Sequence, residues 1–78
     1  MSNLEKYNSV FMDSFNLNEN DLNSLKYQSV KEWDSVGHMS LITNLEDVFE
    51  IEMEIDDIID FSSYEKGKEL LGKYNVEI

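Results

Sequence analysis

The 78-residue chain contains no proline and only three glycines, and this shortage of chain-breaking residues is the strongest constraint on its fold. Proline interrupts helices and glycine weakens them, whereas tight hairpin turns depend on glycine. We therefore expect uninterrupted helices rather than hairpins. A chain of this length can build one hydrophobic core at most, which predicts a single domain over residues 1–78. The absence of cysteine excludes disulfides, thiolate metal sites and thiol nucleophiles.

The first predicted helix covers residues 3–15. Ser2 and Glu5 form a capping-box pattern, in which each side chain can bond the backbone amide of the other residue. Apolar residues then recur at helical spacing, and the expected core residues are Leu4, Tyr7, Phe11 and Phe15. A loop rich in asparagine and serine follows over residues 16–33, with one short turn expected near residues 21–25. Such long loops are uncommon in small domains and are often functional.

The second predicted helix starts at Asp34 and Ser35, which are both good N-cap residues, and runs to Phe49 or Glu50. At about 100° per residue, Val36 lies opposite the apolar stripe, so we expect it to be exposed next to Ser35. The residues expected on the buried face are Leu41, Ile42, Leu45, Val48 and Phe49.

The last third of the chain predicts an extended connector over residues 51–55, a helical turn over residues 56–60 and a final helix. The connector alternates in hydrophobicity and should turn Ile51, Met53 and Ile55 inward. The final helix should begin near Ser62, which forms a capping pattern with Glu65, and end near Tyr74; its expected buried residues are Tyr64, Leu70, Leu71 and Tyr74. Gly67 would allow close packing of this helix. The sequence therefore predicts an all-α fold, a small four-helix bundle of three longer helices and one short helix, with a long loop between the first two.

Acidic residues dominate the middle of the chain. The formal net charge is −11, and residues 32–60 carry ten acidic residues and no lysine. This segment repels nucleic-acid phosphates and anionic membranes, so we expect neither as a partner, and it favours basic protein surfaces. A simpler alternative is that the acids only keep the protein soluble. The longest apolar run, Val10–Met12, is too short to span a membrane, and no basic leader is present, which predicts a cytoplasmic protein.

Catalytic and metal sites receive little support. His38 is the only histidine and follows Ser35 by three residues, but a Ser–His pair also needs an orienting acid, an oxyanion hole and a pocket that excludes water. A surface histidine is the simpler interpretation, and we do not expect an enzyme. The acids between Glu50 and Asp60 include no glycine, which an EF-hand loop requires, so no dedicated metal site is expected.

Ser35 is the most informative candidate. Its simplest role is to cap the second helix. However, it follows a long loop, precedes the exposed Val36, and begins a helix with an acidic outer face. A phosphodiester on its hydroxyl would be stabilised by the positive end and free amides of the helix. These features suit a modified serine better than a reacting one.

The run WDSVGHMSLI at residues 33–42, followed by LEDVF at residues 45–49 and IEM at residues 51–53, resembles the acyl carrier protein family. The family's signature is Asp-Ser-Leu or Asp-Ser-Val at the start of a helix, followed by spaced aliphatic residues and a Leu-Glu-acid-x-Phe segment. The resemblance extends over nearly the whole chain, including the order of the helices.

The resemblance implies a carrier that is modified after translation. A phosphopantetheinyl transferase would use coenzyme A and magnesium to attach 4′-phosphopantetheine to Ser35, and the thiol of this arm would hold acyl or aminoacyl groups as thioesters. Asp34 matches the family's aspartate before the modified serine. The residues that the resemblance assigns to partner binding are Val36, Met39, Glu46, Asp47 and Glu50. Ligases that activate the cargo and enzymes that transfer it, all with basic docking surfaces, would then be partners of a monomer.

An acyl chain could also enter between the helices of such a carrier, and the apolar residues expected to line its path are Ile42, Leu45, Phe49, Ile58, Phe61 and Leu71. Fatty-acid carriers commonly read Gly-x-Asp-Ser-Leu-Asp with a glutamate one turn later, whereas this chain has Gly37 after Val36 and Ser40 in place of the glutamate. The sequence is more similar to stand-alone carriers of specialised pathways. Two alternatives stay open: an aminoacyl or peptidyl carrier, and an unmodified acidic interaction module.

Overall fold

Four α-helices and one short 3₁₀ turn make up the structure, a computed structural model that describes all 78 residues. The helices are α1 (Asn3–Phe15), α2 (Ser35–Phe49), α3 (Ile55–Asp60) and α4 (Tyr64–Gly72), and the 3₁₀ turn is η1 (Glu19–Asp21). The predicted all-α class is confirmed, as is a small helical bundle of three longer helices and one short helix. None of these helices is both long and apolar enough to cross a membrane.

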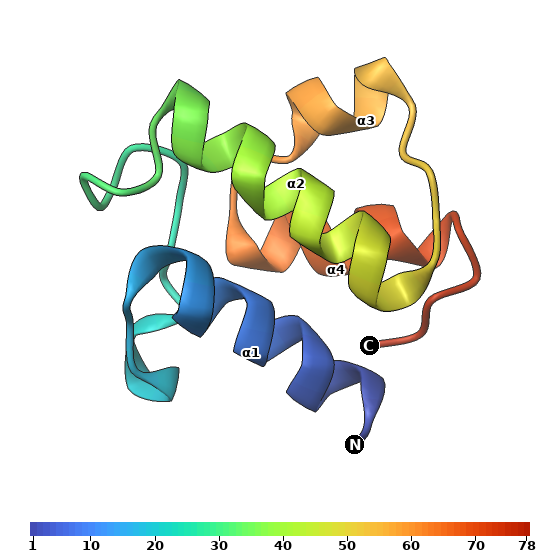
Figure 1. The fold of residues 1–78 in the computed structure, drawn as a ribbon, viewed down its shortest axis with the longest axis horizontal. Helices are drawn as coiled ribbons and strands as arrows, with labels where there is room; N and C mark the ends of the chain where they lie inside the picture. Colours follow the sequence, from blue (N-terminus) through green and yellow to red (C-terminus); the bar gives the residue numbers. More distant parts are fainter.

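Helices α1 and α2 pack against each other and run in opposite directions, with α4 behind them (Figure 1). The short helix α3 lies beside α2. The long loop between α1 and α2, residues 16–34, runs along the left-hand side of the molecule in this view. The two termini are adjacent, because the side-chain amide of Asn3 donates a hydrogen bond to the Glu77 carbonyl oxygen at 3.0 Å. This arrangement brings the start of α2, the long loop and α3 to one end of the bundle.

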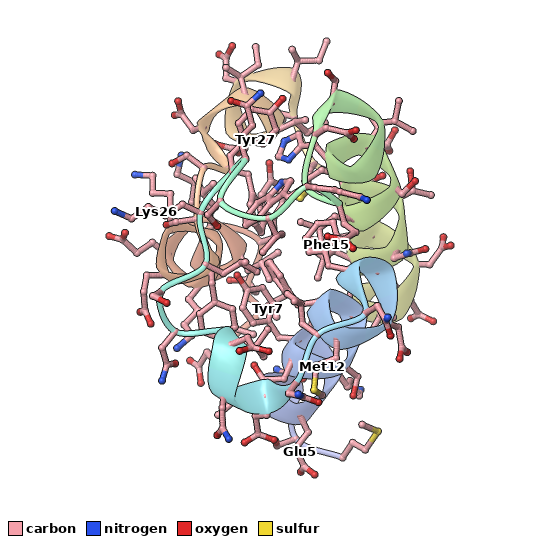
Figure 2. The ribbon with its side chains drawn as sticks, turned by 90° about the vertical axis from the view of Figure 1, so that its left-hand side faces the viewer. Glu5, Tyr7, Met12, Phe15, Lys26 and Tyr27 are labelled. Carbon is pink, nitrogen blue, oxygen red and sulfur yellow. The ribbon has the colours of Figure 1, made fainter.

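A cluster of aromatic side chains lies in the core. Phe11 lies at its centre and contacts aromatic rings from α1, the long loop and the α3–α4 connection. Tyr7 and Phe15 point from α1 into the interior, whereas Lys26 extends from the loop toward solvent (Figure 2). The fully buried side chains with the largest volumes are Trp33, Tyr7, Phe11, Phe15, Phe61, Leu22, Leu41, Ile42, Leu45 and Leu71.

The cap at the start of α1 forms as predicted. Ser2 Oγ accepts a hydrogen bond from the Glu5 amide, and the Glu5 carboxylate accepts one from the Ser2 amide, both at 3.1 Å. The cap of α4 differs from the prediction: Ser63, rather than Ser62, accepts the amide of Lys66 at 3.0 Å. Backbone pairing explains the difference, because the Ser62 carbonyl oxygen accepts the Tyr27 amide at 2.9 Å and so ties this segment to the loop.

Other predicted bounds shift by a few residues. The short turn of the long loop occupies Glu19–Asp21, earlier than expected, and α4 ends at Gly72, before Tyr74. Gly67 does permit close packing, because a methyl group at this position would overlap the Phe61 ring and the Tyr7 hydroxyl.

Three residues expected in the core are exposed instead. Leu4 is 42% exposed because it lies in the first turn of α1, one turn before Tyr7, where it borders a surface hollow between α1, η1 and α4. Val48 is 40% exposed because it lies at the edge of the buried stripe, which is centred on Leu41, Ile42 and Leu45. Ile55 is 74% exposed, since the chain already turns into α3 at this residue and the alternation of the connector ends at Glu54.

Candidate functional site

Ser35 is the first residue of α2, and its hydroxyl makes no hydrogen bond within the chain. The N-cap is Asp34, whose Oδ1 accepts the Gly37 amide at 2.8 Å and whose carbonyl oxygen accepts the His38 amide at 2.7 Å. The simple interpretation of Ser35 as a helix cap is therefore wrong. Its side chain is exposed to solvent.

Unpaired backbone donors lie at the start of α2, next to Ser35. The amides of Ser35 and Val36 belong to the first turn of α2 and have no acceptor within the chain. The macrodipole of this 15-residue helix places partial positive charge at the same end. A negatively charged group on Ser35 would meet both features.

The loop before Ser35 is held tightly against the first turn of α2. The Gln28 amide donates to the Trp33 carbonyl oxygen at 3.0 Å, and the Trp33 amide donates to the Val30 carbonyl oxygen at 3.1 Å. The Glu32 carbonyl oxygen lies so close to Gly37 that any side chain at residue 37 would overlap it. This close contact therefore requires glycine at position 37. It also holds the backbone at Glu32 against the first turn of α2, just before Ser35.

Both ring nitrogens of His38 are occupied. Nδ1 accepts a hydrogen bond of 2.9 Å from Trp33 Nε1, and Nε2 lies 2.8 Å from the Ile58 carbonyl oxygen in α3. No ring nitrogen is left to accept the proton of the Ser35 hydroxyl, so the Ser–His pair does not form in this structure. The interpretation of His38 as a surface histidine is also wrong, because the residue is half-buried and bonded on both sides.

Trp33 begins the run that resembles the carrier family, but its place in the core was not predicted: it is fully buried and packs against Phe11 and Phe15. It joins the core directly to the segment that precedes Ser35. One sequence signal could have predicted that Trp33 is buried, namely its position at the end of a polar loop, immediately before a helix cap.

Two surface hollows open beside Ser35. One lies along α2 and is lined by Ser35, Val36, Met39, Ser40, Thr43 and Asn44. The other, of about 370 Å³, is largely apolar, lies between α2, α3 and the loop, and is lined by Tyr27, Ser35, His38, Met39, Ile58, Ile59, Phe61 and Ser62. Of the six residues expected to line a path for an acyl chain, only Ile58 and Phe61 border this second hollow. Ile42, Leu45 and Leu71 are buried in the core, and Phe49 packs against it.

The residues expected to bind partners are divided between the two ends of α2. Val36 and Met39 are 77% and 52% exposed and lie next to Ser35. Asp47 is exposed about 18 Å further along the helix axis. Glu46 is half-buried and its carboxylate accepts the Met53 amide at 2.9 Å, so it stabilises the connector. Glu50 is exposed and ends α2 in the left-handed conformation, at φ 55°.

Comparisons with protein-family models, with curated proteins and with solved structures found no match. No cluster of three or more histidine, cysteine, aspartate or glutamate side chains has the geometry to hold a metal ion.

Proposed function

We propose that this protein is an acyl carrier protein, which holds acyl or aminoacyl groups as thioesters on a 4′-phosphopantetheine arm attached to Ser35. The observation that carries the proposal is the exposed Ser35 hydroxyl, which has no partner because Asp34 caps the helix in its place. The resemblance of residues 33–53 to the carrier family supplies the chemistry of the modification.

The residues around Ser35 fit such an arm. The free amides of Ser35 and Val36 and the positive end of α2 stabilise a phosphodiester at this hydroxyl. The two hollows beside Ser35 provide space for a phosphopantetheine arm that extends from the serine in either direction. The arm itself contributes a thiol, which this cysteine-free chain lacks.

Each neighbouring residue has a defined role in this proposal. Asp34 holds the first turn of α2 in place and with it the Ser35 hydroxyl. Trp33 and His38 fix the preceding loop and α3 on either side of the serine. The acidic surface of residues 32–60 attracts enzymes with basic docking surfaces, which include a phosphopantetheinyl transferase, a ligase that activates the cargo and enzymes that transfer it.

We assign the carrier to a specialised biosynthetic pathway, because Gly37 and Ser40 stand where carriers of fatty-acid synthesis commonly have acids. Within this assignment the cargo is an acyl or an aminoacyl group. The carrier acts as a cytoplasmic monomer, which suits a protein that moves between enzymes.

The intact mass of the protein tests the proposal. The purified chain is incubated with coenzyme A, magnesium and a promiscuous phosphopantetheinyl transferase, and its mass is measured before and after. We expect a gain of one phosphopantetheinyl group on the wild type, with no gain on Ser35→Ala and full gain on Ser40→Ala, which alters another exposed serine of α2. An unchanged mass of the folded wild type would contradict the proposal and favour an unmodified acidic interaction module.

A further inference from the structure

A polar hollow lies between α1, η1 and α4, and it shares no residue with the two hollows beside Ser35. Its volume is about 280 Å³, close to the lower end of small-molecule sites, which begin at roughly 300 Å³. Its lining includes Leu4 and Asn8 of α1, Glu19 of η1, and Tyr64 and Lys68 of α4. We refer to it as the α1–α4 hollow. The proposed function makes no use of it, so its polar lining needs a separate explanation.

Asn8 presents a free hydrogen-bond donor to the α1–α4 hollow. The residue is only 9% exposed, although asparagine is a poor helix former and its amide is costly to bury without partners. Its Oδ1 accepts a hydrogen bond from the Tyr64 hydroxyl, whereas its Nδ2 has no acceptor within the chain. Every fully buried side-chain polar atom in the structure has a partner, so Nδ2 is open to the hollow that Asn8 lines. A ligand oxygen in the hollow would satisfy this donor.

Lys68 adds a positive charge close to this donor. Its Nζ lies 4.5 Å from the centroid of the Tyr64 ring, whose hydroxyl bonds Asn8, so one buried tyrosine positions both groups. Lys68 Nζ also lies 3.5 Å from the Glu65 carboxylate, which is 62% exposed. Such an exposed pair is weak, and an ammonium group keeps further N–H donors for a ligand. Asn8 and Lys68 together therefore suit a carboxylate.

Glu19 brings the opposite charge to the same hollow. It is exposed, and it forms an ion pair neither with Lys68 nor with any other lysine. Burial is the main cause that raises the pKa of Tyr64, and the carboxylates of Glu65 and Glu19 raise it further. The Glu19 charge thus acts at the tyrosine that positions Asn8 and Lys68. The α1–α4 hollow holds one carboxylate and one ammonium group that do not neutralise each other directly.

The charge of the whole chain decides which ligand such a hollow selects. A net charge of −11 repels a simple anion and attracts simple cations to many parts of the surface, so neither is specific to this hollow. A zwitterion has no net charge, and it binds best where a positive and a negative group are held apart. Leu4, which is 42% exposed and lines the hollow, adds an apolar contact. This combination matches an amino acid with a small aliphatic side chain.

We infer that the α1–α4 hollow binds a small free α-amino acid. The carboxylate of the ligand accepts hydrogen bonds from Asn8 Nδ2 and Lys68 Nζ, and its ammonium group donates to the Glu19 carboxylate. Its side chain packs against Leu4. The inference is independent of the proposed function, because none of these residues lines the hollows beside Ser35.

A titration of the nitrogen-labelled chain with L-valine, followed by heteronuclear NMR, tests the inference. We expect saturable shifts of the backbone amides that line the α1–α4 hollow and of the Asn8 side-chain amide. Acetate and methylammonium each carry one half of the charge pair, so each should bind about tenfold more weakly or worse. The absence of saturable shifts at the hollow with L-valine at up to about 50 mM, where a site with a millimolar Kd is nearly saturated, would overturn the inference.

Charge variants locate the binding. Glu19→Gln and Lys68→Gln should each raise the Kd for L-valine about tenfold, the loss expected for one hydrogen bond to a charged group. Lys66→Gln and Glu69→Gln are the matched controls, because both residues belong to α4 but do not line the hollow, and their Kd should equal that of the wild type. Equal losses in all four variants would show that only the overall charge matters and would contradict the site.

Leu4→Ser tests the contact with the ligand side chain. It should reduce the preference for L-valine over glycine while leaving the Kd for glycine unchanged, and an unchanged preference would contradict this contact. Thermal melts of all the variants establish that they are folded. Ser35→Ala, which removes the hydroxyl of the proposed carrier site, should bind L-valine as the wild type does. Failure of L-valine to bind a wild type that is loaded at Ser35 overturns this inference alone.

Discussion

The indole Nε1 of Trp33 donates a hydrogen bond of 2.9 Å to Nδ1 of His38, and this contact determines the tautomer of the imidazole. Because Nδ1 accepts, the proton lies on Nε2, which donates to the Ile58 carbonyl oxygen at 2.8 Å. The planes of the two rings are nearly parallel, with an interplanar angle of 16°, as an edge-to-edge hydrogen bond between them requires. One side chain thus joins the long loop, α2 and α3 beside Ser35.

Replacing His38 by phenylalanine should lower the free energy of unfolding by about 1–3 kcal/mol, since the buried indole N–H and the Ile58 carbonyl oxygen both lose their partner. Urea denaturation measures this change. A double-mutant cycle with Trp33→Phe isolates the contact between the two rings. If the effects of the two substitutions simply add, the hydrogen bond contributes nothing to stability.

Asp34 and Ser35 should differ sharply in their effect on stability. Asp34→Ala removes the side chain that caps α2 and should cost about 1 kcal/mol, whereas Ser35→Ala should change stability by less than about 0.5 kcal/mol. Thermal denaturation of the two variants measures the difference. The reverse order, with Ser35→Ala the more destabilising, would mean that the serine caps the helix in solution.

Capping patterns and apolar spacing predicted most of the fold, because both act locally. Ser2 and Glu5 place the start of α1, and the Asp34–Ser35 pair places the start of α2. These local signals also predicted that Val36 is exposed next to Ser35, as the structure shows. They could not decide whether Asp34 or Ser35 caps α2. This distinction matters for the site, because the residue that does not cap the helix keeps its side chain free of a backbone partner.

The remaining features depend on contacts between distant segments. Ser63 caps α4 because Ser62 pairs with the loop backbone at Tyr27, and no local pattern reports that pairing. The Trp33–His38 contact requires the loop to fold back over α2. Ile55 was expected inside because its segment alternates, but polar bonds orient α3 with this residue outward.

Gly67 and Gly72 lie in the same helix and should respond in opposite ways to substitution by alanine. A methyl group at residue 67 overlaps the Phe61 ring and the Tyr7 hydroxyl, so Gly67→Ala should destabilise the protein by about 1–3 kcal/mol. Gly72 has open space around it, and Gly72→Ala should be neutral or stabilise by up to about 1 kcal/mol. Chemical denaturation of both variants checks the prediction, and equal effects would mean that α4 is not closely packed at Gly67.

Asp57 should make stability depend on pH at the acidic end. Hydrogen bonds from the Tyr74 hydroxyl and then from Lys73 hold the pKa of Asp57 below its usual value of 3.8. A lowered pKa contributes stability above the unfolded-state pKa, and this contribution disappears as the pH falls through the folded-state pKa. The stability difference between wild type and Asp57→Asn should therefore shrink as the pH falls from about 5 to about 2. Asp56→Asn, which removes an exposed acid without partners, should leave this pH dependence unchanged.

The acidic segment should make the protein more stable at higher ionic strength. Residues 32–60 carry ten acids and no lysine, and only Asp57 of these acids forms an ion pair. Raising NaCl from about 10 mM to about 150 mM shortens the screening length from roughly 30 Å to roughly 8 Å, which weakens this repulsion. We expect the melting temperature to rise with NaCl and with MgCl₂, and to rise less in Asp47→Asn/Glu52→Gln, which removes two exposed acids. A wild-type melting temperature that does not change with salt would show that the acids are too far apart to repel one another, and that their role is limited to the partner surface.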